Sequence, residues 1–367
     1  MDELKTYILN AENKAQAFLK EYNEPVFLYG GGVSCYFYLK WMHENKIEPE
    51  GIIESDISKW ETKGYRVYDL PVYDLDYVND NYSDCSIVIA SPKYLGEIRT
   101  MLEDNCPEAH IYGFEAEIYL SFIKDIEAYR KMLIDNWDRI NSLYYLLEDD
   151  LSRRTLKAFI RGRVSGDLKY FSGAMVSDQY YPRDIFDFNE QEVMVELGTN
   201  DGKTFLEFIK KVNSKYKSIY LFEPDPECIG QITSILRDNA SLDNVHLIEK
   251  GAWNEETVLS FEGDGNYGNG HISEEGSINI PTTTVDTVVK ECVTFIKMDI
   301  EGAELNALKG ASRIIKDYKP KLAICVYHNP MDFIEIPEYI HSLVPEYRFY
   351  LRHHNWSATE TVLYGVA

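Results

Sequence analysis

Apolar runs of strand length alternate with segments of helical spacing in the first third of the chain. The run VFLYGGG at residues 26–32 ends in glycines and is followed by residues 34–45, where apolar positions recur at helical spacing. Further strand-like runs lie at 51–56, 86–91 and 110–115, and a second helical segment covers 93–105. This alternation predicts a small parallel α/β domain over residues 1–121.

The middle of the chain has a different pattern. From residue 122 to about 163 apolar positions keep a helical period and no strand-like run interrupts them. The pattern predicts a helical connector, which we assign to residues 122–190. Arg153, Lys157 and Arg161 share one face of this segment, and such a row is usually a solvated helix face rather than an anion site.

A second α/β alternation begins after Glu190 and predicts a domain over residues 191–367. It has candidates for a sheet of seven main strands, with a β-rich excursion between the third and fourth of them. Helices are expected at residues 204–212, 226–239, 303–315 and 336–343.

Composition and charge exclude several classes of function. The 37 basic and 61 acidic residues give a net charge of −24, which would repel nucleic acids and anionic lipid heads. No apolar run is long enough to span a bilayer, and the N-terminal residues lack the order of a signal peptide, so we expect a cytoplasmic protein. The six cysteines are scattered, which indicates neither a disulfide framework nor a zinc site.

The strongest local pattern is VMVELGTNDG at residues 193–202, where a buried-strand run ends in a glycine turn and a helix begins. A dinucleotide site would need a middle glycine, whereas Asn200 stands there, and Glu196 and Asp201 would repel a pyrophosphate. Carboxylates suit the ammonium and sulfonium groups of S-adenosylmethionine. Glu223, 21 residues past Gly202, could accept the ribose hydroxyls. The alternative is the glycine turn of any βα unit.

Six ordered blocks extend this pattern: VELGTNDG, LFEPDP, IPTTTVD, FIKMDIEGAELNALKGA, PKLAICVYH and YRFYLRHH. In this order and spacing the chain resembles FkbM-type S-adenosylmethionine-dependent methyltransferases from about residue 150 to its end. The resemblance includes residues 152–170 and 179–182, which precede the first core strand. It implies a Rossmann-like class I methyltransferase fold with a seven-stranded sheet and S-adenosylmethionine as cofactor.

The resemblance also implies roles for particular residues. The cofactor turn would comprise Gly198, Asn200, Asp201 and Gly202, with Glu196 at its start. Glu223 and the following Pro224 would hold the ribose. The adenine would lie beside Gly251, Ala252 and Trp253, where the Trp253 ring either stacks on the purine or belongs to the core.

Candidates for catalysis lie at the ends of the fourth and fifth strands. Asp299 would orient an acceptor hydroxyl and His328 would take its proton, since imidazole titrates near neutral pH. Structural roles remain open, with Glu301 capping the next helix and His328 a satisfied loop residue. Glu304 lies one turn into that helix. Magnesium is a third option, but histidine is a poor ligand for it, so we predict no obligatory metal.

Arg352, His353 and His354 close the sixth strand, where they either shape an acceptor pocket or form an exposed strand end. In the first domain, Gly30 and Gly32 lack the third glycine of a dinucleotide fingerprint, although Glu54 follows the second strand. That domain looks like the small Rossmann-like domains attached to enzymes that modify surface sugars. Cys35 would crowd the turn, and NAD is not the favoured ligand.

We therefore expect an S-adenosylmethionine-dependent O-methyltransferase. The resemblance suggests as acceptor a hydroxyl of a small polar compound, a sugar or sugar nucleotide of a bacterial surface polysaccharide. One alternative is an NAD-dependent nucleotide-sugar oxidoreductase or epimerase that uses the N-terminal domain. Another is a non-catalytic binding protein on a methyltransferase fold. The sequence leaves open the acceptor, the methylated position and whether the chain forms a homo-oligomer.

Overall fold

A computed structural model describes the chain except for residues 59–65, 83, 240–241, 243, 263–269 and 274–275. The described residues form two compact units. Unit 1 comprises residues 1–137, 156–175 and 355–359, and unit 2 comprises residues 138–155, 176–354 and 360–367. Residues of the expected connector, 122–190, thus occur in both units, and the domain boundaries inferred from the sequence remain predictions.

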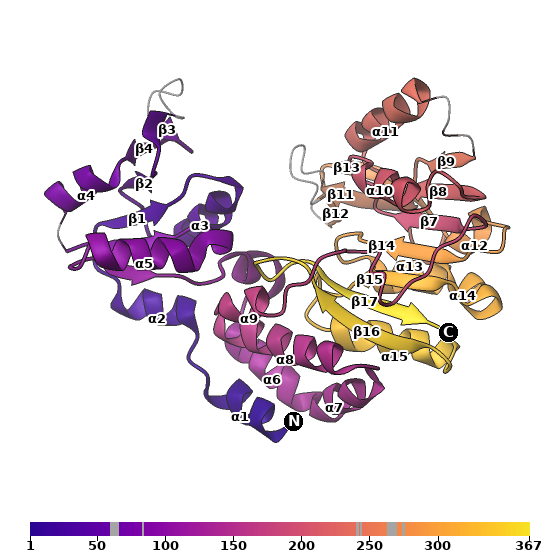
Figure 1. Ribbon diagram of the computed structural model, residues 1–367, viewed down its shortest axis with the longest axis horizontal. Coiled ribbons are helices and arrows are strands. Elements are labelled where there is room, and N and C mark those ends of the chain that lie inside the picture. The colour runs from indigo at the N-terminus through magenta and orange to yellow at the C-terminus, as the bar shows by residue number, and fades with distance from the viewer. Residues whose placement is uncertain (59–65, 83, 240–241, 243, 263–269, 274–275) are drawn as a thin grey trace. The chain divides into compact units, whose positions relative to one another are not determined.

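Unit 1 is built on a six-stranded sheet in the order β3-β4-β2-β1-β5-β6 (Figure 1). All neighbouring strands are parallel except β3, which runs antiparallel to β4. The strands are β1 (Val26–Tyr29), β2 (Gly51–Ile53), β3 (Arg66–Val67), β4 (Leu70–Tyr73), β5 (Ser86–Ile89) and β6 (His110–Tyr112). This confirms the small Rossmann-like α/β fold expected at the N-terminus.

Alternate residues of the β1 strand bury against two different hydrophobic clusters, as a sheet covered on both faces requires. Leu28 packs with residues of α2 (Lys14–Glu21) and α3 (Val33–Glu44), whereas Phe27 packs with residues of α4 (Leu75–Asn81) and α5 (Leu95–Asn105). The remaining helices of this unit are α1 (Asp2–Asn10), α6 (Ile126–Asp135), α9 (Lys169–Ser172) and the end of α8 (Asp150–Ser165).

Unit 2 contains a seven-stranded sheet in the order β16-β17-β15-β14-β7-β8-β9. β17 runs antiparallel to both its neighbours, and the other neighbouring pairs are parallel. The strands are β7 (Val193–Leu197), β8 (Ser218–Phe222), β9 (Val245–Ile248), β14 (Phe295–Met298), β15 (Lys321–Cys325), β16 (Arg348–His353) and β17 (Thr361–Val366). The expected seven-stranded sheet is therefore confirmed.

The β-rich excursion forms a separate four-stranded sheet in the order β10-β13-β11-β12. Its strands are β10 (Gly251–Ala252), β11 (Val258–Glu262), β12 (His271–Ile272) and β13 (Ile278–Thr283). Because β10 follows β9 after a few residues, this sheet begins at the carboxyl end of the third main strand.

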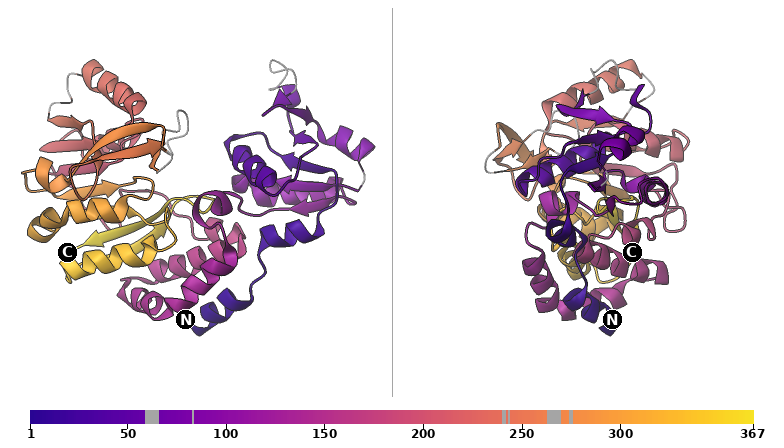
Figure 2. Two further views of the ribbon diagram at one scale, coloured as in Figure 1. Left: turned by 180° about the vertical axis from the view of Figure 1, so that it is seen from behind. Right: turned by 90° about the vertical axis from the view of Figure 1, so that its left-hand side faces the viewer.

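Helices of unit 2 mostly follow the predicted pattern. They are α7 (Trp137–Leu146), α10 (Lys203–Lys211), α11 (Pro226–Asp238), α12 (Val285–Val288), α13 (Glu304–Gly310), α14 (Ser312–Tyr318) and α15 (Asp332–Leu343). The prediction of a single helix over residues 303–315 was wrong, because Ala311 interrupts it and separates α13 from α14. Figure 2 shows α15 beside the hairpin of β16 and β17.

Buried parallel strands place the motif residues at one edge of the main sheet. β7 and β14 are buried along their whole length, and Met194 pairs with Phe295 in register. Since the carboxyl ends of parallel strands share an edge, the turns after β7, β8, β14 and β15 meet there. Among the described residues no helix has the length and apolar character needed to cross a membrane.

Candidate functional site

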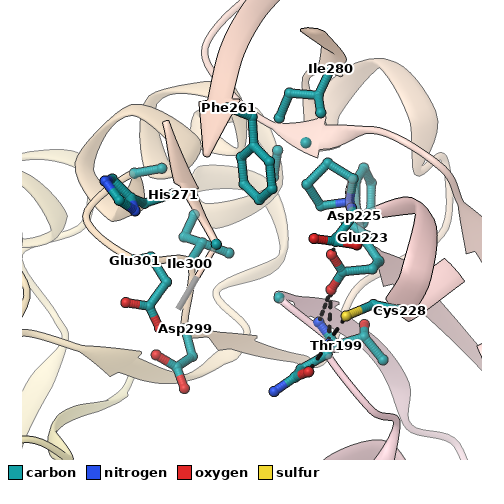
Figure 3. A pocket seen from close by; sticks show the side chains of 18 of the residues that line it. Thr199, Glu223, Asp225, Cys228, Phe261, His271, Ile280, Asp299, Ile300 and Glu301 are labelled. Carbon is teal, nitrogen blue, oxygen red and sulfur yellow. Dashed lines mark hydrogen bonds between the residues drawn. The ribbon is translucent and has the colours of Figure 1, made fainter. Parts of the chain in front are cut away.

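A cavity of about 520 Å³ lies at the carboxyl edge of the unit 2 sheet (Figure 3). Its walls are formed by the turn after β7, the end of β8, the four-stranded sheet with its strand β10, and the end of β14. The predicted site residues that line it are Gly198, Asn200, Asp201, Glu223, Pro224, Gly251, Ala252 and Asp299. The predicted residues outside its lining are Glu196, Gly202, Trp253 and His328.

The turn after β7 depends on glycine. Gly198 has a φ of 77°, and a Cβ added there would lie 1.8 Å from the carbonyl oxygen of Asp299. Only a residue without a side chain lets the two strand ends approach this closely. Gly202, with a φ of 80°, caps the N-terminus of α10. It therefore belongs to the turn without lining the cavity.

Glu223 is the residue that fixes this turn. Its Oε2 accepts hydrogen bonds from the backbone N–H groups of Thr199, at 3.1 Å, and Asn200, at 2.8 Å. Its Oε1 accepts one from Asp225 N–H at 3.0 Å. Burial raises the pKa of Glu223, and the backbone donors partly oppose this effect. The carboxylate faces the cavity with lone pairs left for further donors (Figure 3).

The wall formed by β10 has almost no side chains. Gly251 and Ala252 line the cavity there, together with Ile280 of β13, whose side chain lies 3.3 Å from a Cβ built on Gly251. Trp253 lies outside the lining, and its carbonyl group packs against Gly310 of α13. The stacking of the Trp253 indole on the adenine stays a prediction, with a place in the core as its alternative.

Asp299, at the end of β14, faces the other side of the cavity. Its Oδ2 accepts a hydrogen bond of 2.7 Å from the Tyr180 hydroxyl, and its Oδ1 accepts one of 3.4 Å from Tyr327. Burial alone would raise the pKa of Asp299, but the charges of Lys297 and His328 outweigh burial and lower it. The Asp299 side chain is therefore an ionised carboxylate held by two phenols.

His328 is surrounded by carboxylates. Its Nδ1 lies 2.8 Å from Glu304 Oε1, and its Nε2 lies 3.4 Å from Glu301 Oε2 and 3.5 Å from Asp299 Oδ1. Neither nitrogen makes a well-directed hydrogen bond, so these contacts are mainly ionic. Burial would lower the pKa of His328, but Glu304 and Glu301 raise it well above its usual value. An imidazolium in this position donates protons and does not accept them.

Glu196 belongs to a buried ion pair and not to the cavity wall. It accepts a hydrogen bond from the Thr204 hydroxyl and lies 3.5 Å from Lys297 Nζ, which also donates to Gly198 O at 2.8 Å. Burial raises the pKa of Glu196. Burial would lower the pKa of Lys297, but Glu196 and Asp299 outweigh it and raise that pKa. Through the hydrogen bond of Lys297 to Gly198 O, this ion pair stabilises the glycine turn.

Sequence reasoning missed Lys297, Tyr180, Tyr327 and Glu360. Lys297 carries a signal, because it interrupts an apolar strand, and a buried lysine needs a partner. Tyr180 carries none, since its contact with Asp299 spans 119 residues. Gln179 donates a hydrogen bond to Glu360, whose pKa burial and the charge of Asp299 raise to about 7.

Two groups of described residues bring together side chains that could ligate a metal ion. One comprises Asp299, Cys325 and Glu360, and the other comprises Asp299, Glu304 and His328. Both include Asp299, so both lie at the end of β14. In the second group the imidazolium of His328 stands where a cation would be needed, between the carboxylates.

The residues that close β16 do not line the cavity, and they are not an exposed strand end either. His353 is buried, with Nδ1 2.8 Å from the Thr361 hydroxyl. Burial lowers the pKa of His354 to about 4, and its Nε2 lies 2.8 Å from the Tyr364 hydroxyl. Arg352 pairs with Asp149, which ties β16 to the start of α8.

A backbone N–H group of the glycine turn of unit 1 is already bound by a side chain of the same unit. Gly31 N–H donates a 2.5 Å hydrogen bond to Glu54 Oε1, the carboxylate that would otherwise meet a ribose. Cys35 is fully buried in the cluster that α2 and α3 share. On α8, Arg153 pairs with Asp150, and Arg153, Lys157 and Arg161 are half-buried, whereas a solvated face was expected.

Residues 196–355 match the family model described as the methyltransferase FkbM domain. The chain carries an FkbM methyltransferase domain. Domains of this family use S-adenosylmethionine, so the FkbM resemblance and the cofactor class expected from the sequence are both confirmed. The FkbM domain includes the cavity, the glycine turn after β7, Asp299 and His328.

Two relatives extend the comparison. The crystal structure of an FkbM methyltransferase from Methylobacillus flagellatus KT covers 99% of this chain and 96% of its own, at 22% identity and a TM-score of 0.79. This likeness shows the fold. Hexuronic acid methyltransferase AglP of Haloferax volcanii is 27% identical over 133 residues, 35% of this chain. The chain spans about half (53%) of the length of that curated relative.

Proposed function

We propose that this protein is an S-adenosylmethionine-dependent O-methyltransferase whose acceptor is a sugar hydroxyl of a bacterial surface polysaccharide or its precursor. The observation that carries the proposal is the cavity of the FkbM domain, which has the Glu223-bound turn on one side and Asp299 on the other. The Haloferax volcanii relative, a hexuronic acid methyltransferase by name, supports a sugar acceptor.

The cavity fits the proposed cofactor. Glu223 offers carboxylate lone pairs to the ribose hydroxyls, and the bare wall of Gly251 and Ala252 leaves room for the adenine ring. Asp201 supplies negative charge for the ammonium and sulfonium groups. When bound, the cofactor supplies an electrophilic methyl group on its sulfonium.

Asp299 is the residue proposed to orient the acceptor hydroxyl and take its proton. Tyr180 and Tyr327 hold the carboxylate in place, and Asp299 lines the cavity. The proton-accepting role first expected of His328 moves to Asp299, because His328 is buried outside the lining and surrounded by carboxylates. His328 instead holds Asp299, Glu301 and Glu304 together as a cation.

We further propose that the reaction needs no metal. A protonated imidazole cannot ligate a cation, and it stands between the carboxylates that would do so. Turnover should therefore be unchanged in excess EDTA after extensive dialysis. Loss of turnover that magnesium restores would contradict this proposal.

Thermal unfolding with S-adenosylhomocysteine and, separately, with NAD tests the function. A ligand at 100 times its dissociation constant adds about 2.7 kcal/mol to the free energy of unfolding, so the midpoint should rise with S-adenosylhomocysteine. Glu223→Ala should abolish the rise, and the exposed control Glu249→Ala should keep it. Stabilisation by NAD alone would instead support the oxidoreductase alternative in unit 1. Binding without product across a broad panel of sugars would support a non-catalytic protein.

A further inference from the structure

The cavity is strongly acidic. Among the described residues that line it, six carry carboxylates and a single lysine is present, Lys297. The carboxylates belong to Asp201, Glu223, Asp225, Glu227, Asp299 and Glu301. Since S-adenosylmethionine brings a net charge of only about +1, bound cofactor leaves the wall negative.

The cations of this region are already paired. Lys297 Nζ donates to Gly198 O and lies 3.5 Å from Glu196. His328 lies within 3.5 Å of the carboxylates of Asp299, Glu301 and Glu304, so one positive charge faces three negative ones. Neither cation is available to bind an anionic substrate.

Two carboxylates whose charge is not fully offset by a cation lie opposite the proposed cofactor site, where the acceptor would bind. Figure 3 shows Asp299 and Glu301 across the cavity from Glu223 and Asp225, on the same side as His271. The side chain of Asp299 is 20% exposed to solvent, and that of Glu301 is 26% exposed. A substrate group that enters beside Asp299 therefore meets two carboxylates and the imidazole of His271.

This charge distribution discriminates between acceptors. A uronate or phosphate next to the reacting hydroxyl would be repelled by Asp299 and Glu301. A protonated amine would be attracted by the same pair and could donate hydrogen bonds to both. Because the Asp299 and Glu301 side chains are only 20% and 26% exposed, both effects exceed those at a fully exposed surface.

We propose that the acceptor is an amino sugar whose protonated amine is bound by Glu301 and Asp299 beside the hydroxyl that is methylated. This inference rests on the proposed methyltransferase function. It distinguishes this chain from the relative whose name gives a hexuronic acid as substrate, because an acid of that kind would place a like charge against Glu301.

The test measures binding of matched sugars to the full chain saturated with S-adenosylhomocysteine, at neutral pH and constant ionic strength. The probes are glucosamine, galactosamine and mannosamine, with glucose and glucuronic acid for comparison, and the readout is the midpoint of thermal unfolding. At least one amino sugar should bind about fivefold or more tightly than glucose, and glucuronic acid should bind most weakly. Glu301→Gln should reduce the preference for the amine at least about threefold, whereas Glu249→Gln, at an exposed position, should keep it.

The outcomes separate this inference from the function on which it rests. If S-adenosylhomocysteine itself does not stabilise the wild-type chain, the methyltransferase proposal fails. If it does, then equal or tighter binding of glucuronic acid, or no stabilisation by any amino sugar, overturns the inference. Magnesium chloride is added alone as a further arm. Stabilisation by magnesium that Glu301→Gln abolishes would assign the carboxylates to a metal ion and would also overturn it.

Discussion

At the scale of single residues, the clearest prediction concerns Asp299. Asp299→Asn keeps the size of the side chain and a carbonyl oxygen that can accept from Tyr180, but it removes the base. Turnover should fall by about 10²- to 10⁴-fold, the usual contribution of general base catalysis. The affinity for S-adenosylhomocysteine, measured by calorimetry, should change little. Equal loss of both would show that Asp299 shapes the cofactor pocket.

His328 makes a second prediction, about stability and pH. Its pKa is raised in the folded chain, so its contribution is fully present below the unfolded value of about 6.5 and is lost as pH rises through the folded pKa. His328→Gln removes the charge that holds three carboxylates and should lower the free energy of unfolding by about 3 kcal/mol near pH 6.

Urea unfolding of both proteins between pH 6 and pH 10 measures this difference. It should shrink as the pH rises, because the wild-type chain loses its imidazolium while the variant has none to lose. A difference that grows with pH would mean that His328 is neutral in the folded chain.

At the scale of elements, apolar runs predicted the main strands because parallel strands are buried on both faces and exclude polar residues. β7 and β14 illustrate this, since all their residues are buried. The prediction of one helix over 303–315 was wrong because the interruption depends on a tertiary contact, which the spacing of apolar residues does not show. Gly310 packs against the backbone of Trp253, and the chain turns at Ala311 instead of continuing.

The glycine turn after β7 gives the prediction for this scale. Gly198→Ala would place a Cβ 1.8 Å from Asp299 O at a residue with a φ of 77°. The ends of β7 and β14 would have to separate, so binding of S-adenosylhomocysteine should be lost and stability should fall by about 2 kcal/mol or more.

Gly230 is a matched control within the same unit. It lies on the exposed side of α11, and a Cβ there would meet no heavy atom within 4 Å. Gly230→Ala should therefore raise the free energy of unfolding by about 0.5 to 1 kcal/mol and leave ligand binding unchanged. A mild effect of Gly198→Ala, close to that of Gly230→Ala, would contradict the steric argument.

At the scale of the whole molecule, the sequence located one half of the site better than the other. The turn at 198–202 and Glu223 are local motifs, each attached to a strand end, so spacing alone brought them together. The partners of Asp299 come from segments distant in the chain, as the bond from Tyr180 shows. Only the folded sheet brings those groups into contact, and their charges then decide which group is ionised.

Net charge is a whole-molecule property that the sequence does determine, and it makes the last prediction. With 61 acidic and 37 basic residues the folded chain repels itself, and salt screens this repulsion. Raising ionic strength from about 0.01 M to about 0.15 M shortens the screening length from about 30 Å to about 8 Å, so the unfolding midpoint should rise by a few degrees. Sodium chloride and choline chloride should act alike, because screening depends on ionic strength and not on the cation. A midpoint that falls with salt would mean that attractive ion pairs outweigh the excess of negative charge.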